Sequence, residues 1–455
     1  MRKSVVIPII IVVVIIAVVV AVLNWPRDQN GEVPTEVRLG ATLPESGIFA
    51  GFGEQGWGMQ KAVNDWNDTY GGMYLSEWDV TVPITLTIKD NQSDPNQVGP
   101  QSTDLVVSDG VHGLLSPNAP CDLHDPTTVV ASDYGVPSII AGGPVEPWLF
   151  GSQGGVAPEY TWFTGFAIGE YQPAAPRDVP GYTMVDTWFM FMDEVDAKTE
   201  TNKIVGVFAS SDSDGTGWYN AFPGILEDAG YTVANVTGKF AMDPMPDFTE
   251  MVHQWQAANV TILWGNCPGA HFGVLWSTCY AEGFRPKICL AARAALFPND
   301  VESWGTDPPL GWGVGCEMWW APTYQVADGF VGIGNRTAAS LAEDWATETG
   351  DPLNRSIGTG YTAAQIMLDA IHEAGDVGGD AINDALADTD LHTINGWVSF
   401  EPASHFSAVP LSFGQWFYDD ENEDEPFTQY ITNSALPIIA EEESPIFPID
   451  ETLYS

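Results

Sequence analysis

Basic residues are scarce in this sequence, and their scarcity argues against one class of partner. The 455 residues include 15 Lys and Arg against 61 Asp and Glu, which gives a formal net charge of −46. A surface of this sign repels nucleic-acid phosphates and anionic lipid headgroups, so we expect no nucleic-acid partner. The charge suits a solvated surface in salt or beside multivalent cations, and it says little about the fold.

Local motifs for catalysis and metal binding are also missing. The sequence has no G-x-x-x-x-G-K-[ST], no G-x-S-x-G and no H-E-x-x-H, and its seven histidines are scattered. We therefore expect no enzyme activity, no catalytic residue, no cofactor and no metal. Asp122, His124 and Asp125 lie close together, but they open an expected helix whose N-terminus favours carboxylates. Helix capping explains them better than a metal does.

The five cysteines are too far apart for a C-x-x-C metal site. Cys267, Cys289 and Cys316 lie near the ends of expected strands, and Cys279 lies on a helix between two of them. An odd number of cysteines outside the cell leaves at least one thiol unpaired. Two alternatives remain for these cysteines: a disulfide within the group, or buried free thiols.

A long apolar run lies at the N-terminus. Residues 5–23 are apolar and follow Arg2 and Lys3; the run is long enough to span a bilayer and longer than a usual signal peptide core. The basic residues before it place the short end inside. We therefore expect a membrane anchor at residues 1–24, a polar linker at residues 25–36 and an extracytoplasmic remainder, with a cleaved signal peptide as the alternative.

The segment at residues 37–72 sets the expected fold. Its first residues, 37–43, form a short apolar run that Pro44 and Gly47 stop, as in a buried parallel strand. Apolar residues then recur at spacings of three and four until Gly71, as in a helix that ends at glycine. Strand, loop and helix open a doubly wound α/β unit, which binds ligands at the carboxyl ends of its strands.

The order Leu-Pro, Ser-Gly, Phe-Gly and Gly-Gly within residues 43–72 is shared with a known family. Later matches are Gly-Val-Pro at residues 135–137, Tyr-Thr-Ala-Ala at residues 361–364, and Gly396 with Phe400. Over residues 37–419 the chain resembles the type I extracytoplasmic solute-binding proteins, the branched-chain amino-acid-binding family of ABC importers. The resemblance is stronger in order and spacing than in identity.

The length of the chain exceeds what one hydrophobic core supports, so two lobes are expected. The resemblance implies two doubly wound, Rossmann-like α/β lobes joined by three crossings. The expected parts are lobe 1 at residues 37–163 and 322–394, lobe 2 at residues 164–321 and 395–420, the third crossing at residues 392–400, and an acidic tail at residues 421–455. For the tail, a disordered or loosely docked segment and a docking peptide for a partner are both considered.

The resemblance implies a ligand between the lobes, held by hydroxyl and backbone N–H groups of lobe 1 and an acidic residue of lobe 2. This chain departs from that pattern. The hydroxyl positions fall on Ala119 and Pro120 and near Pro144, in the run Ala141-Gly142-Gly143-Pro144, and the acidic position falls at or beside Ala292-Arg293. The Arg293 guanidinium can bind a carboxylate bidentately or form a structural ion pair.

Two aspartates and several aromatic residues complete the expected site. Asp212 and Asp214 follow a strand of lobe 2, where they hold a cation or amine or cap the loop. Aromatic rings at strand ends cover apolar ligand surface or hold a cation, although most Trp side chains belong to cores. The candidate ligand-binding residues are Phe52, Asn118, Ala119, Pro120, Gly142, Gly143, Asp212, Asp214, Trp264, Asn266, Arg293, Trp319 and Trp320.

These expectations describe a solute-binding protein that captures a small polar solute, an amino acid or a related amide or carboxylate, by hinge closure. Its expected partners are the solute, the permease subunits of an ABC importer, and the membrane through the N-terminal helix. Two other functions are kept open. A ligand-sensing ectodomain needs a separate signalling subunit, because only residues 1–4 lie inside, and an acidic surface-layer or structural protein has no transport role.

Overall fold

The structure is a computed structural model that describes residues 33–117, 119–169, 181–422, 425–446 and 449. The expected membrane anchor at residues 1–24 lies outside this part of the chain, as does most of the expected linker. Among the described residues, no helix combines the length and the apolar character needed to cross a bilayer.

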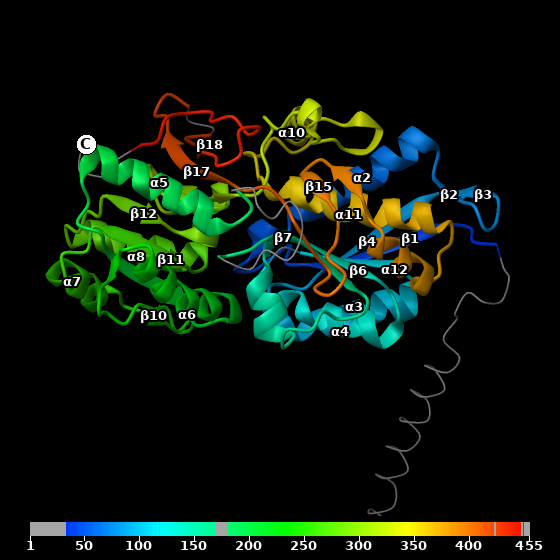
Figure 1. The fold of residues 1–455 in the computed structure, drawn as a ribbon, viewed down its shortest axis with the longest axis horizontal. Coiled ribbons are helices and arrows are strands. Elements are labelled where there is room, and N and C mark those ends of the chain that lie inside the picture. The colour runs from blue at the N-terminus through cyan, green and yellow to red at the C-terminus, as the bar shows by residue number, and fades with distance from the viewer. Residues whose placement is uncertain (1–32, 118, 170–180, 423–424, 447–448, 450–455) are drawn as a thin grey trace, which may run out of the picture.

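Lobe 1 is a parallel sheet with helices on both faces. Its strand order is β4-β1-β5-β6-β7-β16. Helices α2 and α11 pack together above the sheet in the view of Figure 1, and α3 and α4 pack together below it. The bounds are β1 Val37–Leu43, β4 Ile84–Asp90, β5 Gly113–Ser116, β6 Ser138–Pro144, β7 Thr161–Phe166, β16 Phe406–Ala408, α2 Gln55–Tyr70, α3 Pro95–Asp104, α4 Asp125–Tyr134, α10 Ala338–Thr349, α11 Ser356–Ala374 and α12 Gly379–Ala387.

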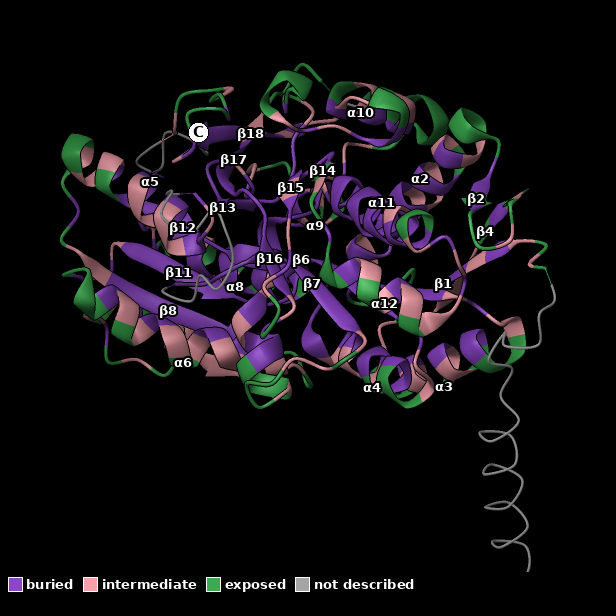
Figure 2. Cartoon of the chain, turned by 45° about the vertical axis from the view of Figure 1, so that its right-hand side comes forward, coloured by how far each residue is buried: buried purple, intermediate pink, exposed green. Residues whose placement is uncertain are grey.

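Lobe 2 has the sheet order β10-β8-β11-β12-β13-β17-β18, with β9 beside β8. Strands up to β13 run parallel, whereas β17 and β18 are antiparallel to their neighbours. Both sheets are buried beneath helices, as parallel sheets must be (Figure 2). The bounds are β8 Ile204–Ser210, β9 Thr232–Val233, β10 Lys239–Phe240, β11 Ile262–Asn266, β12 Ile288–Leu290, β13 Gly315–Met318, β17 Ser412–Tyr418, β18 Phe427–Asn433, α5 Met184–Thr199, α6 Ser213–Asp228, α7 Thr249–Ala257, α8 Gly269–Ala281 and α9 Pro298–Ser303.

The third crossing lies later in the chain than expected. Residues 392–400 were expected to form it; instead, hairpin β14–β15 (Leu391–Thr393 with Gly396–Val398) occupies most of this stretch. A second hairpin in lobe 1 joins β2 Met73–Leu75 and β3 Val80–Val82. Strand β16 still pairs with β7 of lobe 1, and β17 already pairs with β13 of lobe 2. The chain therefore changes lobes at residues 409–411.

The acidic tail is ordered in part, contrary to a disordered or loosely docked segment. Residues 427–433 form β18, which pairs with β17 and extends the sheet of lobe 2. Phe427 lies in the hydrophobic core of lobe 2, whereas Ile431 and Leu436 pack into the core of lobe 1. The sequence prediction gave more weight to the acidic residues on either side of this segment than to its apolar residues, and so it missed the strand. The tail thus packs against both lobes.

The packing of β18 predicts different effects for two isoleucines of the tail. Ile431 is fully buried and Ile438 is 43% exposed. Replacing Ile431 with Ala should lower the free energy of unfolding by about 2–5 kcal/mol, because the substitution leaves a cavity. The matched change Ile438→Ala should stay within about 0.5 kcal/mol of wild type. Urea denaturation measures both, and two equally small effects would contradict the docked tail.

Candidate functional site

A buried ion-pair cluster lies where the carboxyl ends of the lobe 2 strands meet lobe 1. Arg293 stands in the 3-10 turn Ala292–Ala295 after β12 and is 5% exposed. Its Nη2 lies 2.7 Å from Asp212 Oδ2, and its Nη1 lies 3.1 Å from Asp214 Oδ2. Nη2 also donates to Ser210 Oγ at 2.9 Å. The sequence left a ligand or an internal ion pair open for Arg293, and in this conformation it makes the ion pair.

The chain positions the two aspartates through the loop between β8 and α6. Asp212 is the N-cap of α6 and accepts from Gly215 N at 3.0 Å. Asp214 follows in the first turn and accepts from Asn266 Nδ2, at the end of β11, at 2.9 Å. Residues at the ends of parallel strands β8 and β11 and in the loops after β8 and β12 thus meet in one hydrogen-bonded cluster, as the geometry of a doubly wound sheet requires.

The two carboxyl groups titrate differently because their surroundings differ. Burial alone would raise the pKa of Asp212, but the charge and hydrogen bond of Arg293, with further hydrogen bonds from Gly215 and Ser210, lower it to about 2. Burial raises the pKa of Asp214, and Arg293 offsets this only in part, because the neighbouring Asp212 charge opposes it. Two carboxyl groups therefore share one guanidinium.

Aromatic side chains of lobe 1 close over this cluster. The Phe49 ring lies 5.5 Å from the Arg293 guanidinium, in a cation–π contact. Phe52 packs edge-on against Phe297, with ring centroids 4.7 Å apart, and stacks with Trp319 at 6.3 Å. Only about 10 Å³ remains between Ile48–Phe52 of lobe 1 and the loops of lobe 2, the size of a single water. The chain's own side chains thus fill the centre of the interlobe cleft.

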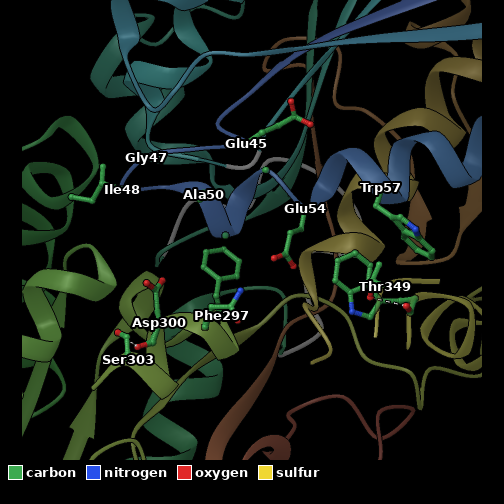
Figure 3. Close-up of a pocket in the computed structure, with 14 residues that line it drawn as sticks. Glu45, Gly47, Ile48, Ala50, Glu54, Trp57, Phe297, Asp300, Ser303 and Thr349 are labelled. Atoms are coloured by element: carbon green, nitrogen blue, oxygen red, sulfur yellow. Dashed lines mark hydrogen bonds between the residues drawn. The ribbon is translucent and has the colours of Figure 1, made fainter. Parts of the chain in front are cut away.

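A larger pocket opens at the mouth of the same cleft. It encloses about 500 Å³ between the loop at residues 45–54 with α2 and α10 of lobe 1 on one side and α9 of lobe 2 on the other. Its walls include Trp57 and Trp345, whose rings meet edge-on with centroids 5.2 Å apart. Phe297 forms part of the floor, and the Glu54 side chain points into the space beside it (Figure 3). The volume suits a small molecule.

The pocket is acidic. Glu45, Glu54 and Asp300 line it, and the described residues contribute no Lys, Arg or His to the lining. Burial, reinforced by the charges of Asp351 and Asp300 against a hydrogen bond to Asn354, raises the pKa of Glu54 to about 7. Burial raises the pKa of Asp300 to about 7 as well. These groups disfavour an anion and favour a cation or a hydrogen-bond donor.

The structure distributes the candidate residues unevenly. Phe52, Ala119, Asp212, Asp214, Asn266, Arg293 and Trp319 gather at the contact between the lobes, and Pro120 is buried beside Ala119. Trp264 packs inside lobe 2 against Trp188, and Trp320 is buried in the core of lobe 1. Gly142 and Gly143 belong to a bulge in β6. Asn118 lies outside the described residues.

Sequence reasoning missed the residues that line the pocket. The sequence assigns residues 46–53 and 291–296 to loops that line the cleft. Glu54 follows the first loop directly, and Phe297 and Asp300 follow the second within four residues, so wider loop margins would have found them. Gly51 and Gly53 belong to a G-x-G-x-x-G spacing at residues 51–56, which is typical of dinucleotide-binding turns. Here a side chain on Gly51 would meet the Phe297 ring, so Gly51 serves close packing of the lobes.

All five cysteines are buried free thiols, so the disulfide alternative is wrong in this structure. Residues 122–125, which the sequence explains by helix capping, also make other contacts. Asp122 accepts from Ser213 Oγ of lobe 2 at 2.8 Å, while Cys121, His124 and Asp125 lie together at the start of α4. No metal was expected from the sequence, in which Cys121 was not grouped with His124 and Asp125.

The family model described as periplasmic binding protein matches residues 36–422. The chain belongs to the periplasmic binding protein family. The resemblance inferred from the sequence is therefore confirmed, and so is the α/β type I fold. The family consists of extracytoplasmic solute-binding proteins and is not a family of enzymes.

Solved structures of this family share the fold at low identity. A leucine-binding protein from Thermotoga maritima is 17% identical, with a TM-score of 0.64 over 83% of this chain and 95% of that one. A branched-chain amino-acid substrate-binding protein from Streptococcus pneumoniae, in complex with isoleucine, is 16% identical, with a TM-score of 0.65 over 91% and 100%. A solute-binding protein from Rhodopseudomonas palustris, in complex with 3,4-dihydroxybenzoic acid, is 14% identical, with a TM-score of 0.64 over 89% and 98%.

The ion-pair cluster predicts a strong effect of removing its cation. Arg293→Met should lower the free energy of unfolding at neutral pH by about 3–5 kcal/mol, because it leaves two carboxyl groups buried without a balancing positive charge. Lys198→Met removes an exposed ion pair with Glu194 and should cost less than about 1 kcal/mol. Chemical denaturation compares the two.

The lowered pKa of Asp212 fixes the direction of its pH dependence. Its stabilising contribution is complete above the unfolded pKa of about 3.9 and disappears as the pH falls toward 2. In Arg293→Met, the free energy of unfolding should therefore fall less over the same acid range. Equal acid sensitivity and stability in the two proteins would contradict the cluster.

Proposed function

We propose that this protein is the extracytoplasmic substrate-binding component of an ABC importer and captures a small polar solute by hinge closure. Membership of the periplasmic binding protein family supports the class of function. The observation that carries the proposal is the pocket of about 500 Å³ between the two lobes, since it is built from both and changes shape when they move. The expected membrane anchor would hold the protein beside the permease.

The charges of the pocket narrow the solute to one that carries an amine or another cation. Glu54 and Asp300 face the pocket, and the guanidinium of Arg293 in the neighbouring cluster is already engaged by two aspartates. Trp57, Trp345 and Phe297 supply apolar and cation–π surface. An amino acid or amide with a free amine fits this lining, whereas a simple carboxylate lacks a partner in it.

A second function is favoured by one observation. The centre of the cleft, where the resemblance implies a ligand, is filled by Phe49, Phe52 and Arg293 of the chain itself. A filled cleft centre is also what we expect of an acidic surface protein that has no transport role. The ligand screen below separates the two functions.

A thermal-shift screen of amino acids, amides, polyamines, urea and carboxylates tests the solute class. An amine-bearing compound should stabilise the protein by roughly 2.7 kcal/mol at one hundred times its dissociation constant. Glu54→Gln should weaken that binding by about tenfold, because it removes a carboxylate from the pocket. Glu227→Gln, on the exposed side of α6, is the matched control and should bind as wild type. A screen without any stabilising solute favours the structural role.

The pKa values near 7 predict that cation binding strengthens as the pH rises. Between about pH 6 and about pH 8, Glu54 and Asp300 lose their protons, so affinity for an amine that stays charged should increase by about tenfold. Isothermal titration calorimetry across this range measures the change. The double variant Glu54→Gln, Asp300→Asn should bind weakly and independently of pH; an unaltered pH profile would remove these groups from the site.

A further inference from the structure

A cysteine, a histidine and an aspartate meet at the start of α4, outside the solute pocket. Cys121 opens the 3-10 turn Cys121–Leu123 and Asp125 is the first residue of α4, with His124 between them. One ligand atom from each residue lies within 4.8 Å of the other two. Cys121 is 4% exposed and His124 is 3% exposed, so most of the group is sealed from solvent.

The His124 ring provides a separate sign of a missing partner. Its Nδ1 is buried and has no hydrogen-bond partner within the described part of the chain. Asp125 Oδ1 lies 3.3 Å from it, but without the geometry of a hydrogen bond. A buried polar nitrogen without a partner costs about 1–3 kcal/mol. A metal ion is a partner that this nitrogen could use.

The spacing of the three ligand atoms matches a small tetrahedral site. Zinc bonds of about 2.0–2.3 Å place neighbouring ligand atoms roughly 3.3–3.8 Å apart. The 3.3 Å between His124 Nδ1 and Asp125 Oδ1 already equals such an edge. The 4.8 Å limit for the whole group means that Cys121 needs to approach by little more than 1 Å.

We propose that Cys121, His124 and Asp125 bind a thiophilic divalent cation such as Zn²⁺. Sulfur, nitrogen and oxygen in one set favour zinc and disfavour magnesium and calcium, which take oxygen ligands. Three protein ligands leave a fourth coordination position open. On binding, the Cys121 S–H bond breaks, a metal–sulfur bond forms, and the proton passes to solvent.

The neighbourhood supplies compensating negative charge and links the site to both lobes. The carboxyl groups of Asp122 and Asp214 lie within electrostatic range of the Cys121 thiol, and Asp214 also interacts with His124. Asp214 belongs to lobe 2, and Ser213 beside it donates to Asp122 across the lobe contact. Other groups also contact the ligands: Gln153 Nε2 lies 3.5 Å from Asp125 Oδ1, Ser152 hydrogen-bonds with the Cys121 thiol, and the His124 ring meets Phe163 edge-on. The site is independent of the proposed solute and of its pocket.

Cobalt substitution tests the site in the full chain. After chelation, one equivalent of Co²⁺ should produce a thiolate-to-cobalt charge-transfer band in the near ultraviolet, and titration with Zn²⁺ should displace it. Cys121→Ala should abolish the band and weaken Zn²⁺ binding by at least about tenfold. Cys279→Ala removes an equally buried thiol from α8 of lobe 2 and should leave both unchanged.

His124→Gln keeps the thiol and covers the case in which Cys121→Ala does not fold. It should weaken Zn²⁺ binding by at least about tenfold, as measured by calorimetry, while circular dichroism in chelator shows a native spectrum. Absence of stoichiometric Zn²⁺ binding to the wild type would overturn the proposal. So would a charge-transfer band that survives in Cys121→Ala, or wild-type affinity in His124→Gln.

Discussion

The buried guanidinium of Arg293 is the constraint around which the contact between the lobes is organised. A charge with 5% exposure requires partners, because its transfer from water costs several kcal/mol. The loop after β8 supplies Asp212 and Asp214, and the end of β11, just before its loop, supplies Asn266 to hold Asp214. Because these loops follow neighbouring parallel strands, they meet at one edge of the sheet.

Aromatic residues of lobe 1 pack over this cluster and its neighbours. Phe49 lies over the guanidinium, and Phe52 packs edge-on against Phe297 and stacks with Trp319. Their packing fills the middle of the cleft and leaves the open volume at its mouth, where Glu54 and Asp300 face it. The acid surroundings that neutralise Arg293 and the acid lining of the pocket together make this cleft attractive to cations.

The sequence predicted the strands, the helices and their order well, because each carries a local signal. Residues 37–43 form β1 as expected from an apolar run stopped by proline and glycine. The late third crossing and strand β18 were missed, because both depend on which distant strand is the partner: β7 holds β16 in lobe 1, and β17 recruits residues from an acidic segment. Trp264 and Trp320 were placed at the cleft because a strand end does not reveal which way its side chain faces.

By itself, the sequence determined the α/β alternation, the family and the loops that approach the lobe contact, since periodicity, turn residues and motif order are written along the chain. Only the tertiary structure decided that Arg293 pairs with Asp212 and Asp214, that Glu54 and Asp300 share a pocket, and that Cys121 reaches His124 and Asp125. The physical reason is that burial and pairing depend on distances between side chains from different loops and helices. Charge and spacing along the chain leave those distances unspecified.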